Sequence, residues 1–167
     1  YTGSVPDFRH VVTHELVHVF MLDMLFGGRG PEHVARSVGQ FMMPPLWFIE
    51  GLAEYCSTRW DADAEGLLRD AVTSGEALPL TESGPITGTV RMYKEGQSFL
   101  MHLAARFGDA RIFDLREDWG RGDYFETGYR LTFGEPVEKT DELWLESVRR
   151  RYYPAITESA PVKEAAL

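Results

Sequence analysis

The sequence PDFRHVVTHELVHVFMLDMLF, residues 6–26, decides the fold of this chain. Its apolar residues recur at the three- and four-residue intervals of an α-helix, at Phe8, Val11, Val12, Val19, Leu22 and Leu25. Glycines at 27, 28 and 30 and a proline at 31 follow directly and are typical of a helix end. We therefore expect a first helix from Pro6 to Phe26.

Similar patterns continue along the chain. They predict helices over residues 31–41, 46–60, 61–74, 90–107, 109–119, 123–133 and 141–153. We expect Thr140 to cap the last helix and Pro154 to stop it, and residues 78–88 to form an irregular loop. No segment alternates convincingly as a strand would. The prediction is a mainly α fold with one domain over residues 1–153 and a tail or linker over 154–167.

Composition limits the function classes. The chain has 167 residues, 44% of them hydrophobic and 26% charged, as expected for about one globular domain. A net charge of −9 argues against nucleic acid as a partner, because nucleic-acid binders present a basic face. The single cysteine, Cys56, excludes an internal disulfide framework and a cysteine-cluster metal site.

Two further expectations concern the setting of the chain. No apolar run approaches 18 residues, so we expect no membrane span. The chain begins at Tyr1 and carries no signal-peptide pattern. We therefore interpret it as a piece of a longer protein with further domains, whose compartment the sequence leaves open.

The first predicted helix contains His14-Glu15-Leu16-Val17-His18, an H-E-x-x-H pattern. Four residues on a 3.6-residue helix place the two imidazoles about 40° apart on one face, so both can reach one ion at about 2.1 Å. Glu15 lies nearby and can act on a bound water. The alternative is a helix with incidental histidines. His10 lies on the same stripe, and we do not expect it to be a ligand.

A zinc site needs a third protein ligand and an open position for water. Glu50 follows three large apolar residues, in Leu46-Trp47-Phe48-Ile49-Glu50-Gly51-Leu52-Ala53-Glu54, where an unpaired carboxylate would be costly to bury. The small residues Gly51 and Ala53 would let this helix approach the first one closely. The alternative is that Glu50 and Glu54 form a solvated helix face. Beside the H-E-x-x-H pattern, Glu50 is the candidate third ligand.

With these motifs the chain resembles the gluzincins, zinc metallopeptidases with two histidines and a downstream glutamate on the metal. It is most similar to the bacterial peptidase MA-like proteins and the aminopeptidase branch, whose W-x-x-E-G-x-A segment matches Trp47, Glu50, Gly51 and Ala53. The 31 residues between His18 and Glu50 exceed the aminopeptidases' usual 18. The resemblance implies a helical catalytic subdomain in which the H-E-x-x-H helix packs on the third-ligand helix.

The resemblance also implies a role for each site residue. One Zn²⁺ would bind His14, His18 and Glu50, with Glu15 as general base. Glu54 would accept a hydrogen bond from His14, as in thermolysin-type sites; the alternative is an exposed helix glutamate.

Tyr93, in Tyr93-Lys94-Glu95-Gly96, falls where aminopeptidase relatives carry Y-x-K-G or Y-E-K-G, with lysine and glutamate in swapped order. Its hydroxyl would stabilise the tetrahedral intermediate; otherwise it packs on Phe99 or Leu100. The small residues Gly96 and Ser98 suit close packing against the metal helix.

The expected function is zinc-dependent hydrolysis of a bond in a peptide or protein substrate. A non-catalytic, metal-stabilised helical binding module within a larger protein is the alternative, and a helical interaction domain without metal is a weaker one. The isolated His33 and His102 are expected to be ordinary helix residues.

Overall fold

The computed structural model describes residues 4–26, 44–122 and 124–158. These residues form seven α-helices and two short 3-10 helices, with no strand among them. The elements are α1 (Val5–Phe26), α3 (Leu46–Ser57), α4 (Ala62–Thr73), η1 (Leu80–Glu82), η2 (Gly84–Ile86), α5 (Val90–Phe107), α6 (Asp109–Gly122), α7 (Phe125–Phe133) and α8 (Val137–Glu158). The prediction of a mainly α fold is confirmed. The helix predicted over 31–41 and His33 lie outside the described residues.

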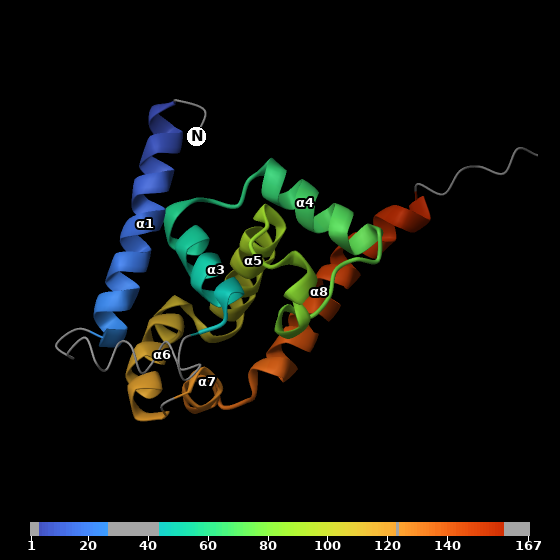
Figure 1. Cartoon of the computed structure of the whole chain (residues 1–167). Helices are drawn as coiled ribbons and strands as arrows, with labels where there is room; N and C mark the ends of the chain where they lie inside the picture. The colour runs from blue at the N-terminus through green and yellow to red at the C-terminus, as the bar shows by residue number, and fades with distance from the viewer. Residues whose placement is uncertain (1–3, 27–43, 123, 159–167) are drawn as a thin grey trace, which may run out of the picture.

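Helices α3 and α5 pack against each other at the centre of the structure (Figure 1). Helix α1 lies on the outer side of α3, so the two segments predicted to carry the metal ligands pack together as expected. Helices α4 and α8 pack together beside α5, and α6 and α7 form the end of the molecule near the C-terminal end of α1. None of the described helices has the length and apolar character needed to cross a membrane.

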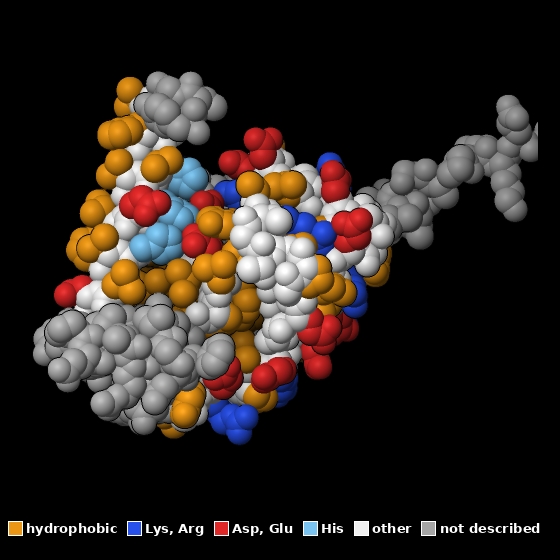
Figure 2. Space-filling model, in the orientation of Figure 1, with side chains coloured by type: hydrophobic (Ala, Val, Ile, Leu, Met, Phe, Trp, Pro, Cys, Tyr) orange, Lys and Arg blue, Asp and Glu red, His pale blue; other side chains and the backbone are white. Residues whose placement is uncertain are grey.

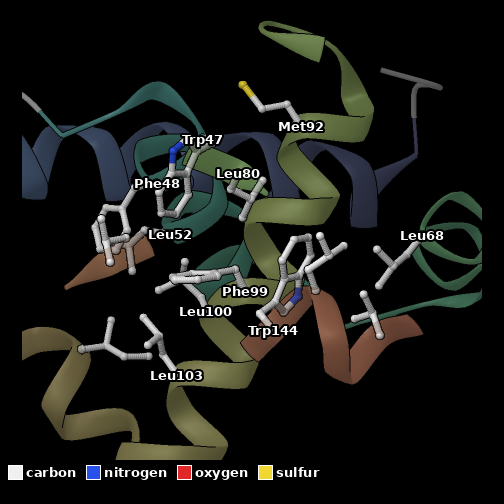
Figure 3. Close-up of a cluster of buried hydrophobic side chains, with 14 of the residues drawn as sticks. Trp47, Phe48, Leu52, Leu68, Leu80, Met92, Phe99, Leu100, Leu103 and Trp144 are labelled. Carbon is white, nitrogen blue, oxygen red and sulfur yellow. The ribbon is translucent and has the colours of Figure 1, made fainter. Parts of the chain in front are cut away.

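The core lies where α3, α5 and α8 meet (Figure 3). Trp47 stacks edge-on against Phe99, with ring centroids 5.1 Å apart, and Phe99 contacts Trp144 in the same way at 6.2 Å. The Trp144 indole Nε1 donates a hydrogen bond to Ser98 Oγ at 3.0 Å, so its polar atom is satisfied. The predicted small residue Ser98 therefore supports the core and does not face α1. This packing fixes α5 against α3, and with it the distance between their polar residues.

The glycine expected to bring α3 close to α1 faces a different helix. Gly51 lies against Gly96 of α5, with backbone touching backbone, and neither residue mediates the approach of α1. The expectations for Gly51 and Gly96 are therefore corrected. Both positions do need a residue without a Cβ, but the close contact joins α3 to α5.

Five of the apolar residues that predicted α1, namely Phe8, Val11, Val12, Val19 and Leu22, are exposed, and apolar side chains follow the outer edge of this helix in Figure 2. Helical spacing identifies a helix equally well whichever face is buried. In the described structure the inner face of α1 instead contributes Met21 and Val17 to the core, together with the histidines. The exposed large apolar residues of α1 are Val5, Phe8, Val11, Val12, Leu16, Val19, Phe20 and Leu22.

The last helix is longer than predicted at both ends. It begins at Val137, so Thr140 lies inside it; the Thr140 hydroxyl donates to Glu135 Oε1 at 2.9 Å and does not cap a helix start. Pro154 does not stop the helix, which continues to Glu158. A proline there removes the backbone hydrogen bond to residue 150 without ending the helix.

Candidate metal centre

The two histidines of the H-E-x-x-H pattern project from the inner face of α1 toward α3. Glu50 on α3 meets both: its Oε2 lies 3.1 Å from His14 Nε2 and 3.3 Å from His18 Nε2. The three predicted ligand atoms form a group that could hold a metal ion, all within 4.8 Å of one another. Donors bound tetrahedrally at 2.0–2.1 Å lie roughly 3.3–3.5 Å apart, so the histidine–glutamate separations are close to those of a zinc site.

The group is largely withdrawn from solvent. The side chains of His14 and Glu50 are 10% and 13% exposed, and that of His18 is 20% exposed. Burying a carboxylate and two imidazoles is costly unless they are paired or bound to a metal. Figure 2 shows the histidines gathered between α1 and the rest of the molecule, with acidic side chains beside them. His18 is the most exposed of the three side chains, so solvent can still reach the group at this residue.

Glu54 lies one helical turn beyond Glu50 and faces the opposite edge of the His14 ring. Its Oε1 is 3.2 Å from His14 Nδ1, the neighbour predicted from the sequence. The two atoms are not aligned as a hydrogen bond, and Nδ1 is buried with no hydrogen-bond partner among the described residues. The predicted position of Glu54 is thus found, whereas the predicted hydrogen bond is not formed.

A second histidine–glutamate group overlaps the first. His10, His14 and Glu54 also bring three potential ligand atoms within 4.8 Å of one another, with His10 Nε2 3.1 Å from Glu54 Oε1. However, Lys94 Nζ lies 2.5 Å from Glu54 Oε2. An ammonium group paired with one of the candidate ligands repels a metal cation placed there, so the group formed with Glu50 is the better metal site.

Tyr93 at the start of α5 faces the ligand group. Its ring stacks on that of His14, with centroids 6.0 Å apart and planes inclined by 16°. Burial raises the pKa of the Tyr93 phenol, and a hydrogen bond to Glu50 and the negative charges of Glu50, Glu54 and Glu15 raise it further. The hydroxyl therefore remains a proton donor at neutral pH.

Glu15 is exposed on α1 immediately after His14. Its charge is one of those that raise the pKa of the Tyr93 phenol, so the carboxylate lies near the tyrosine. A carboxylate that is open to solvent beside the ligand group can reach a water molecule there.

An open cavity of about 360 Å³ lies beside Tyr93 and Glu54, and its lining residues include none of the three proposed ligands. This volume lies in the range of about 300–1,000 Å³ that small-molecule sites occupy. Its walls combine side chains of α1, α3 and α5 with the turn before α5: His10, Glu54, Gly88, Val90, Tyr93 and Lys94. The cavity gives a substrate space beside Tyr93.

Sequence reasoning missed Lys94 and gave His10 no role. Both contact Glu54, from α5 and α1. The only signals were the position of His10 one turn before His14 and of Lys94 next to Tyr93. His102 lies half-buried on α5, where burial and then the charge of Arg106 lower its pKa, and it belongs to neither ligand group.

The ligand geometry thus joins residues from α1 and α3, with Tyr93 of α5 beside them. Comparisons of the chain with protein-family models, with curated proteins and with solved structures found no match.

Proposed function

We propose that this protein is a zinc-dependent peptidase, in which His14, His18 and Glu50 bind one Zn²⁺. One observation carries the proposal: a single oxygen of Glu50 lies within 3.3 Å of both imidazoles of the H-E-x-x-H pattern, from a helix distant in sequence. The resemblance to gluzincins implies the same three ligands. The H-E-x-x-H pattern and Glu50 lie far apart in the sequence. Their contact in the structure supports the proposal that they bind the same ion.

The donor set suits zinc. Two neutral imidazoles and one carboxylate are typical of catalytic zinc sites, which keep a further position for water. Such a site retains one net positive charge, as a Lewis acid requires. When bound, the zinc would polarise the scissile carbonyl and lower the pKa of a water molecule toward 7.

Glu15 is the proposed general base. Its carboxylate would accept a proton from the attacking water and deliver it to the nitrogen of the leaving amine. The position directly after His14 keeps Glu15 close to the metal, while its solvent exposure leaves it free of the ligand group. Such a proton transfer contributes roughly 10²–10⁴-fold to a rate.

Tyr93 is the proposed oxyanion donor. Its phenol stays protonated because burial and neighbouring carboxylates raise its pKa. A hydroxyl beside the ligand group can donate to the negative charge that develops on the carbonyl oxygen. The cavity beside Tyr93 would receive the peptide.

Metal analysis tests the ligand set. Protein purified without chelators should contain about one zinc per chain, whereas His18→Ala and Glu50→Gln should lose it. Glu142→Gln is the matched control, because Glu142 is exposed on α8 and belongs to neither ligand group. Zinc-free wild-type protein that also fails to take up added zinc would refute the proposal.

Glu15→Gln tests the reaction. The variant should keep its zinc and lose at least about 100-fold in the rate of peptide hydrolysis, measured by mass spectrometry on a mixed-peptide library. Retained hydrolysis would exclude Glu15 as the base. Stoichiometric zinc in wild-type protein that cleaves no peptide would instead favour a metal-stabilised binding module.

A further inference from the structure

Glu54 is held in place from two neighbouring helices. His10 of α1 contacts its Oε1 at 3.1 Å, and Lys94 of α5 contacts its Oε2 at 2.5 Å. Only 6% of the Glu54 side chain is exposed. Oε1 therefore contacts an imidazole and Oε2 an ammonium group, and the carboxylate is buried between them.

We propose that Lys94 and His10 are positioning residues that hold the Glu54 carboxylate against the first metal ligand, His14. The inference rests on the proposed metal site. Metal-bound imidazoles usually donate their other N–H to a carboxylate, which fixes the ring orientation and raises its basicity as a ligand. In the zinc-bound protein that carboxylate would be Glu54, whose Oε1 already lies 3.2 Å from His14 Nδ1, although the two atoms are not aligned as a hydrogen bond.

The geometry assigns different tasks to the two partners. Lys94 holds Oε2 on the side away from His14, which leaves Oε1 facing the ring. His10 shares Oε1 with His14 and limits rotation of the carboxylate on the α1 side. Loss of either partner would let the carboxylate turn away from His14 Nδ1, a buried atom that has no hydrogen-bond partner among the described residues.

Lys94 is itself well anchored. Its side chain is only 13% exposed, and Nζ also lies 3.4 Å from Gln97 Oε1. Gln97 Nε2 in turn donates to the backbone carbonyl of Thr58 at 3.1 Å, just beyond the end of α3. The ammonium is therefore held at the α3–α5 junction by contacts other than Glu54, so its position can fix the orientation of the Glu54 carboxylate.

A second metal ion on His10, His14 and Glu54 is the competing interpretation. It requires a metal cation beside the Lys94 ammonium, and it requires His14 to be a ligand of both ions. The two interpretations differ in zinc stoichiometry, since positioning residues bind no ion. One zinc per chain is expected from positioning and two from a second site.

A double-mutant cycle on zinc affinity tests the proposal. Zinc affinity is measured by competition with a chromophoric chelator for wild type, Lys94→Met, Glu54→Gln and the double variant. We expect Lys94→Met to weaken zinc binding about tenfold, at the lower end of the 10–100-fold effect of groups that orient metal ligands. In the Glu54→Gln background Lys94→Met should have no further effect. The conservative Lys94→Arg should restore most of the affinity.

Further variants keep the test decisive if Lys94→Met folds poorly. The same cycle with His10→Ala should be equally non-additive with Glu54→Gln. Zinc-bound wild type should show a slowly exchanging His14 Nδ1 proton by NMR, which His10→Ala and Lys94→Met should make exchange faster. Lys139→Met is the matched control, because Lys139 of α8 pairs at 3.1 Å with Glu135, which precedes that helix, and both lie outside the two ligand groups.

Each contrary result has a distinct meaning. Unchanged zinc affinity in Lys94→Met, or additive effects in the cycle, overturns the positioning role and leaves the proposed peptidase intact. Two zinc ions per chain, with one lost in His10→Ala, also overturn it and identify a second metal site. A wild-type protein that binds no zinc refutes the proposed function and this inference together.

Discussion

Gly51 of α3 and Gly96 of α5 touch backbone to backbone. A Cβ added at Gly51 would lie 2.6 Å from the Gly96 carbonyl carbon and 2.8 Å from its Cα. A Cβ at Gly96 would collide with the carbonyl oxygen of Trp47. Because the obstacles are backbone atoms, no side chain can move aside, and the two helices would have to separate. Glu50 directly precedes Gly51 on α3, and Tyr93 lies three residues before Gly96 on α5. The contact between the two glycines therefore sets how closely Glu50 and Tyr93 approach each other.

Gly51→Ala should therefore destabilise the protein even though alanine favours a helix. The helix preference contributes about 1 kcal/mol, whereas overpacking typically costs about 1–3 kcal/mol, and contacts below 3 Å with backbone put this site at the upper end. The free energy of unfolding should fall in urea denaturation, and zinc affinity should fall with it because Glu50 is displaced.

Gly66→Ala is the matched control for this substitution. Gly66 lies within α4, and a Cβ there would meet no atom within 4 Å. The same change should stabilise the protein by about 0.5–1 kcal/mol. An increase in stability in Gly51→Ala of similar size would show that α3 and α5 can separate without cost.

Zinc should stabilise the folded protein, because the ligand group exists only when α1 and α3 are packed together. At a free zinc concentration of 100 times Kd the gain is about 2.7 kcal/mol, which corresponds to roughly 5–10 °C in Tm for a chain of this size. Scanning calorimetry with and without a chelator measures the shift. His18→Ala should show the same Tm under both conditions. A chelator effect that persists in His18→Ala would point to a different metal site.

Tyr93→Phe should remove the oxyanion donor and leave the metal in place. Loss of one such donor costs about 10²–10³ in kcat, whereas zinc content should be unchanged because Tyr93 is not a ligand. The pKa of Tyr93 is raised above its ordinary value of 10, first by burial and then by Glu50. In the zinc-free protein the Tyr93 phenol should therefore ionise above about pH 10 in an ultraviolet titration. A component near pH 9 that disappears in Tyr93→Phe would contradict this.

Local spacing explains how much of the site the sequence could predict. His14 and His18 share a helix face because they are four residues apart, whatever surrounds them. Glu50 could be identified because a carboxylate among large apolar residues needs a partner. Neither inference required knowledge of the tertiary packing, and the structure brings all three residues together.

Long-range packing explains what the sequence could not predict. Lys94 reaches Glu54 across 40 positions of sequence, and no local pattern marks such a contact. The outward direction of the apolar face of α1 likewise depends on where α3 lies. The start of α8 was misplaced because the Thr140 hydroxyl serves a tertiary contact with Glu135 and not a cap.

The Arg106–Glu135 pair makes the free energy of unfolding depend on pH in the acidic range. Burial alone would raise the pKa of Glu135, but hydrogen bonds from Arg106, Thr140 and Lys139 outweigh it and lower the pKa to about 2. Because the folded-state pKa lies below the unfolded value near 4.3, the pair stabilises the protein above that value. This stability is lost as the pH falls toward 2.

Glu135→Gln should therefore lower the free energy of unfolding by about 1–3 kcal/mol at pH 7, and the difference from wild type should shrink steadily between pH 4.5 and pH 2. Urea denaturation at several pH values measures it. Glu146→Gln is the control, because Glu146 forms a solvent-exposed pair with Arg150, and such pairs contribute about 0–1 kcal/mol. A difference between Glu135→Gln and wild type that stays constant down to pH 2 would mean that Glu135 stabilises the fold through packing and not through its charge.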